Sequence, residues 1–191
     1  MTKTLWICSV LALMATAESA AAVRPVKSIY TALDLKSCSV IDKHPDGDRM
    51  HCDGLPGYPI YVAEGDLRTF VSVGEHAEVR RAASQTLPSF NTLFKGRSTR
   101  TTIEWRFIIR DEHPVPYATI VRYFTKNDTR RGEVLVVTRV TETEACHVAY
   151  VDAVANPNAI MIARRIADER ARKFDCKSDP ARIGATGKSP M

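Results

Sequence analysis

The cysteines place the strongest constraint on the fold, because each disulfide fixes two segments that must lie together. The chain of 191 residues has five: Cys8, Cys38, Cys52, Cys146 and Cys176. Cys8 lies in an apolar run, residues 5–17, between Lys3 and a small-residue stretch at 17–22. This layout predicts a cleaved signal peptide over residues 1–22. The run of about 13 residues is shorter than the roughly 20 of a membrane-spanning helix.

The four remaining cysteines predict two disulfides, because an exported chain reaches an oxidising compartment. Three pairings are possible, and the surrounding segments favour the local one, Cys38 with Cys52 and Cys146 with Cys176. The first two flank residues 44–47 (His-Pro-Asp-Gly), a turn sequence that predicts a β-hairpin. The second bridge would tie a strand to the helix that follows it. The expected location is the periplasm or the exterior of the cell.

Hydrophobic periodicity predicts that most of the chain is β-structure. Beyond the hairpin, the predicted strands cover residues 60–62, 69–73, 103–110, 117–124, 133–140 and 146–151. The last four are joined by short polar connectors, so they are expected to form an antiparallel meander. Trp105, Phe107 and Tyr150 are expected in its core. No clear period extends from Gly74 to Thr102.

The C-terminal part changes from strand to helix periodicity. Asn156 followed by Pro157 predicts a helix start, and apolar side chains then recur at spacings of three and four up to Phe174. Residues 177–191 have no apolar period and are predicted to be disordered. The expected fold class is α+β in a single domain over residues 23–176. A mainly antiparallel sheet of about six to eight strands, open or curled into a half-open barrel, would be packed by this helix.

The residues that could carry chemistry form no recognisable catalytic or metal motif. His44, His51, His76, His113 and His147 are scattered, and the cysteines lack the spacing of a zinc site. The chain has no nucleophile-elbow sequence for acyl transfer. We therefore predict no catalytic residue, metal or cofactor and favour a binding or interaction protein over an enzyme. A small cell-envelope hydrolase is the alternative.

The net charge of +5 suggests the kind of partner. Basic residues cluster at three places, and candidate anion-binding residues are Arg80, Arg81, Arg130, Arg131, Arg164 and Arg165. If two of these groups share a face, they would suit an anionic component of the cell envelope or another protein. Nucleic acid is disfavoured outside the cytoplasm. The alternative is a charged face that only maintains solubility.

Four segments also resemble a group of small exported proteins from alphaproteobacteria. They are residues 29–35 (Ile-Tyr-Thr-Ala-Leu-Asp-Leu), the hairpin 38–52, residues 61–68 and residues 146–152. The similarity runs from about Ser28 to Cys176. It implies a bacterial periplasmic setting and carries over no functional residue.

Overall fold

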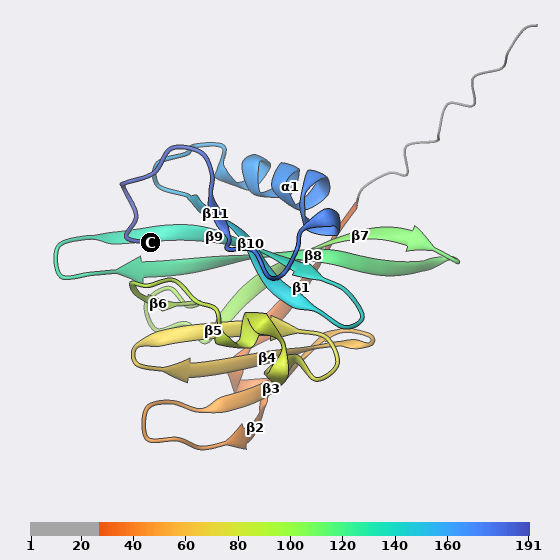
Figure 1. Cartoon of the computed structure of the whole chain (residues 1–191). Helices are drawn as coiled ribbons and strands as arrows, with labels where there is room; N and C mark the ends of the chain where they lie inside the picture. Colours follow the sequence, from red (N-terminus) through yellow and green to blue (C-terminus); the bar gives the residue numbers. More distant parts are fainter. Residues whose placement is uncertain (1–26) are drawn as a thin grey trace, which may run out of the picture.

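The computed structural model describes residues 27–191 (Figure 1), so the predicted signal peptide lies outside the described range. Within that range the chain forms eleven strands in two sheets, one α-helix and four short 3-10 helices. No helix among these residues is long and apolar enough to cross a membrane.

The larger sheet has the order β1-β7-β8-β9-β10-β11, with β6 pairing beside the end of β8. Its strands are β1 (Lys27–Asp34), β6 (Phe90–Thr92), β7 (Arg100–Arg110), β8 (His113–Lys126), β9 (Arg131–Val140), β10 (Ala145–Asp152) and β11 (Ala181–Arg182). All its neighbours are antiparallel except β10 and β11. The predicted meander is therefore confirmed as β7 to β10.

The smaller sheet has the order β2-β3-β4-β5. Its strands are β2 (Ser39–Asp42), β3 (Arg49–Leu55), β4 (Tyr58–Gly65) and β5 (Arg68–Val73). The predicted hairpin is present as β2–β3, and the predicted strands at 60–62 and 69–73 pair as β4–β5. The turn between β2 and β3 lies against β4, and a Cβ at Gly47 would come within 2.5 Å of the Glu64 backbone oxygen. Only glycine fits this approach.

Two apolar cores separate three layers, with α1 above the larger sheet and the smaller sheet below it (Figure 1). The first core lies between the sheets and contains Trp105 and Tyr150, both buried as expected. The second lies between the larger sheet and α1. Because strand side chains alternate between faces, β8 and β9 contribute to both cores. Phe107, also expected in the core, is buried too.

The helix α1 spans Ala159–Glu169 and begins later than predicted. Its N-cap is Asn158, without a side-chain hydrogen bond, rather than Asn156. The Asn156 amide instead donates to the backbone oxygens of Asp152 and Ala185, at 2.8 and 2.7 Å. A tertiary contact therefore uses the side chain that the cap prediction had assigned to the helix.

Helix α1 also explains why charged residues of β7 are buried. Glu104 and Arg106 occupy the polar face of the predicted alternation, yet both are buried. Arg164 of α1 donates to Glu104 at 2.7 and 3.1 Å, and Arg106 donates to Asp168 at 3.0 and 2.7 Å. These pairs offset the cost of burying the charges, while the apolar core between α1 and the sheet packs the helix.

Both disulfides have the predicted local pairing. Cys38 and Cys52 bridge the β2–β3 hairpin with their Cα atoms 4.4 Å apart. Cys146 of β10 joins Cys176 beyond the helix, with a Cα separation of 5.6 Å. The α+β class, the antiparallel architecture and the two bridges are therefore confirmed. The expectation of one sheet, curved around a core as in a half-open barrel, is corrected to two facing sheets, neither of which closes.

The segment without a clear period, 74–102, holds the 3-10 helices η2 (Ala77–Val79) and η3 (Arg81–Ser84) together with β6. Two further 3-10 helices, η1 (Leu35–Ser37) and η4 (Ala171–Lys173), lie elsewhere in the chain. Because β6 pairs with the last residues of β8, this segment is what joins the two sheets on one side.

Residues 177–191 are packed against the domain, which corrects the prediction of a disordered tail. Ala181–Arg182 pair with β10, and Ser189 is buried. The Asp152 carboxylate accepts hydrogen bonds from the Lys188 and Ser189 amides, at 2.9 and 2.8 Å, and from the Ser189 hydroxyl at 2.6 Å. These polar contacts order a segment that has no apolar period to predict it.

Candidate functional site: a cleft between the two sheets

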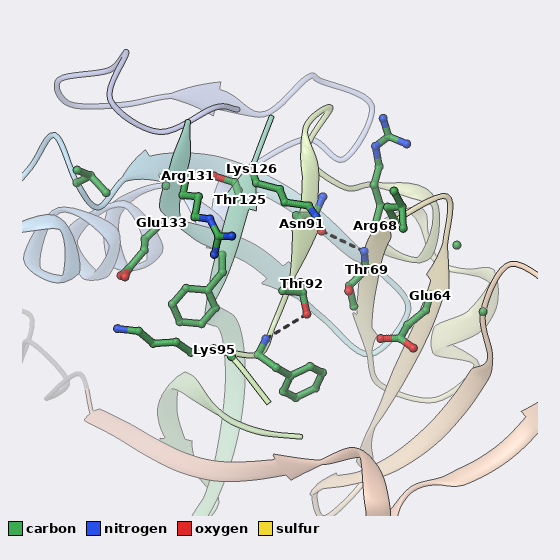
Figure 2. A pocket seen from close by; sticks show the side chains of 18 of the residues that line it. Glu64, Arg68, Thr69, Asn91, Thr92, Lys95, Thr125, Lys126, Arg131 and Glu133 are labelled. Atoms are coloured by element: carbon green, nitrogen blue, oxygen red, sulfur yellow. Dashed lines mark hydrogen bonds between the residues drawn. The ribbon is translucent and has the colours of Figure 1, made fainter. Parts of the chain in front are cut away.

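A cleft of about 750 Å³ is present in the described part of the chain. It lies where the hairpin tips of the smaller sheet meet the β8–β9 end of the larger one, and we call it the inter-sheet cleft (Figure 2). This volume is in the range of small-molecule sites. The lining residues are 46–47, 64–65, 67–69, 91–92, 94–96, 124–126, 131–133 and 154.

Strand register places two cationic side chains of the cleft, Lys126 and Arg131, in one row. Phe90, Lys126 and Arg131 are paired across β6, β8 and β9, so their side chains share a face. The next row on that face is Thr92, Phe124 and Glu133. An aromatic ring therefore lies beside two neighbouring cations.

Three of the four cations that line the cleft are exposed and form no ion pair within the described residues. Lys95, Lys126 and Arg131 have no side-chain hydrogen bond or ion pair to any described residue. Arg68 differs, because it donates to the Pro88 oxygen at 3.1 and 2.8 Å and stacks on Phe90. The cleft therefore has cationic groups available to a ligand.

The acidic groups of the cleft offset these cations only in part. Glu133 pairs with Arg122 at 2.6 Å. Glu64 reaches into the cleft from the β4–β5 side, opposite the β8–β9 strands (Figure 2). Burial, followed by the nearby charge of Asp48, raises the pKa of Glu64. Its carboxyl therefore takes up a proton more readily than an exposed glutamate.

The six arginines proposed from the sequence do not form one site. Most are used inside the fold: Arg80 donates to the oxygens of Glu75, Thr141 and Glu142, Arg81 to Cys176, Arg130 to Gly187, and Arg164 to Glu104. Arg165 is exposed on α1. Only Arg131 of this set lines the inter-sheet cleft.

The acidic groups that line the cleft are Asp46, Glu64 and Glu133. No histidine lines it among the residues that the structure describes. The one fully buried histidine, His147, contacts the Tyr150 hydroxyl at 3.0 Å rather than a carboxylate. Between residues 27 and 191 there is also no group of three side chains placed to hold a metal ion.

The residues of the candidate site that sequence reasoning missed include Glu64, Phe124 and Lys126. A local signal was present for Lys126, because a hairpin closing around residues 127–130 places it opposite Arg131. No local signal places Glu64 on the same cleft. Its position depends on contact between the β4–β5 tip and β6. There the backbone amide of Asn91 donates to the backbone oxygen of Leu67 at 3.0 Å.

No protein-family model matches the chain, and comparison with curated proteins and with solved structures gives no significant match.

Proposed function

We propose that this protein is a non-enzymatic binding module that holds an anionic ligand in the inter-sheet cleft. The observation that carries the proposal is the adjacent pair Lys126 and Arg131, both exposed and free of ion pairs within the described chain. Two adjacent cations at a concave surface attract anions and raise their local concentration. Lys95 adds a third cation from the segment after β6.

We further propose that the protein works in an oxidising compartment, the periplasm or the cell exterior. Two disulfides support this, since such bridges are rare in reducing compartments. The predicted signal peptide and the resemblance to exported alphaproteobacterial proteins favour the same location. The ligand would then be an anionic molecule of the cell envelope or its surroundings.

Calorimetric titration with chemically distinct anions tests the proposed function. The set is phosphate, citrate, an oligoglucuronate and decanoate. At least one should bind, and its affinity should fall about tenfold in Lys126→Gln/Arg131→Gln, because two charge contacts are lost. The affinity should also fall as salt is added.

Arg165→Gln/Arg170→Gln is the matched control, because it removes the same charge from two exposed side chains of α1 and its C-cap, outside the cleft. This variant keeps the Arg164–Glu104 pair, so the packing of α1 is preserved. It should bind as the wild type does. If no anion binds, or if the α1 variant weakens binding as much as the cleft variant, the proposal is wrong.

A further inference from the structure

The inter-sheet cleft is lined by apolar as well as charged side chains. Phe94 lines it and is buried, and Phe124 lines it and is half-buried. Leu67 and Val154 also line it, yet they remain 67% and 47% exposed. These two are among the few large apolar side chains left in water on the described chain, and they come from different elements of the fold.

Leu67 occupies a backbone position that disfavours it. The β4–β5 hairpin turns through Asp66 and Leu67, with φ of 50° and 58°. Two-residue turns with both φ values positive favour glycine at the second position, because a side chain there is strained. Strained residues of this kind are frequent at ligand sites.

The hairpin geometry itself does not call for an apolar side chain. The β7–β8 hairpin makes the same two-residue turn through Asp111 and Glu112, with φ of 49° and 64°. There the second position holds an exposed, charged glutamate. The turn geometry therefore does not explain the leucine at position 67. Its position at the cleft does, because its exposed apolar side chain can contact a ligand there.

We infer that the ligand is an amphipathic anion, whose charged group meets Lys126 and Arg131 and whose apolar body contacts Leu67, Phe94 and Phe124. This inference rests on the proposed function and narrows it to one ligand class. The class includes free alkyl carboxylates and the same anions within lipids. Removal of the exposed leucine surface from water would contribute to binding.

The inference is tested by measuring the binding of decanoate, decanol and citrate to the wild type and to the variants Leu67→Gly and Glu112→Gly. Wild type should bind decanoate at least about tenfold more tightly than citrate, which lacks an apolar body, and than decanol, which lacks the charge. Leu67→Gly should weaken decanoate binding about fivefold, since a leucine contact is lost. Its Tm should equal or exceed that of the wild type, because glycine accepts the positive φ.

Glu112→Gly is the matched control, because it relieves the same turn geometry at the opposite end of β8 from the cleft and outside its lining. It should leave decanoate affinity unchanged. Anionic vesicles as a further arm distinguish a lipid source from a free one. If citrate binds in the cleft as tightly as decanoate, or Leu67→Gly binds decanoate normally, the inference fails while the anion site stands. If no anion binds, the proposed function itself fails.

Discussion

His147 shows how one buried side chain couples folding to pH. Its ring is fully buried and its Nε2 atom has no hydrogen-bond partner among the described residues. Burial lowers the pKa of His147 to about 3. An unfolded histidine titrates near 6.5, so between these values the unfolded state holds a proton that the folded state lacks. The stability associated with neutral His147 is present above pH 6.5 and is lost as pH falls toward 3.

We therefore expect His147→Phe to flatten the acid limb of the stability curve. One proton corresponds to a slope of about 1.4 kcal/mol per pH unit. Urea unfolding at pH 4.5, 5.5 and 7 measures the slopes of both proteins. The free energy of unfolding should fall less steeply with acid in the variant. Equal slopes would show that His147 titrates normally in the fold.

Asp152 makes the second residue-scale prediction. Burial alone would raise the pKa of this carboxyl, but hydrogen bonds from Ser189, Ala155 and Lys188 outweigh it and lower the pKa. Its contribution to stability is thus present above the unfolded pKa near 3.9 and lost as pH falls through the lower folded value. The same bonds attach the tail to β10.

Asp152→Asn should therefore destabilise the fold by about 3 kcal/mol, because amides that now meet a carboxylate oxygen would face a donor. Limited proteolysis should then cleave within residues 177–191. Ser189→Ala is the milder comparison, since it removes one donor and keeps the two backbone bonds. A tail that resists protease in Asp152→Asn would mean that other contacts hold it.

At the scale of elements, the two disulfides link segments that the fold already brings together. They close loops with sequence separations of 14 and 30 residues. The chain-entropy estimate is about 3 kcal/mol for the first and about 3 to 4 kcal/mol for the second. Removing the second by Cys146→Ala/Cys176→Ala should therefore lower the free energy of unfolding by that amount.

Mass measurement checks the bridges before any substitution is made. The protein with both disulfides formed should be lighter than its reduced form by four hydrogen atoms. Unfolding in urea then ranks the two double-alanine variants, and the Cys38→Ala/Cys52→Ala variant should lose the smaller amount. Free thiols at all four positions would remove the basis for both expectations.

Local patterns predicted the elements that carry strong signals and missed those that depend on distant contacts. The alternation around Trp105 and the turn after His44 identified the meander and the first hairpin. β1 was not predicted, because only Leu33 of its eight residues is fully buried and its period is weak. The true cap of α1 was also missed, because the Asn156 side chain contacts a segment 29 residues further along.

At the scale of the molecule, the layered fold explains why the sequence alone could not predict where unpaired cationic side chains gather. The chain has 27 basic and 22 acidic side chains. Many of the basic ones are paired where α1 covers the larger sheet or are bonded to loop oxygens. The cations that remain available at the inter-sheet cleft come together only through the pairing of β6, β8 and β9.

The most direct test of the inter-sheet cleft as a binding site is an amide NMR titration of the protein with decanoate. Chemical-shift changes should cluster in residues 64–69, 91–96, 124–126 and 131–133, which line the cleft. The chemical-shift changes at the same decanoate concentration should be smaller in the variant Lys126→Gln/Arg131→Gln. Changes centred on α1 and its exposed Arg165, or no saturable change in any amide, would contradict the assignment of the cleft as the anion site.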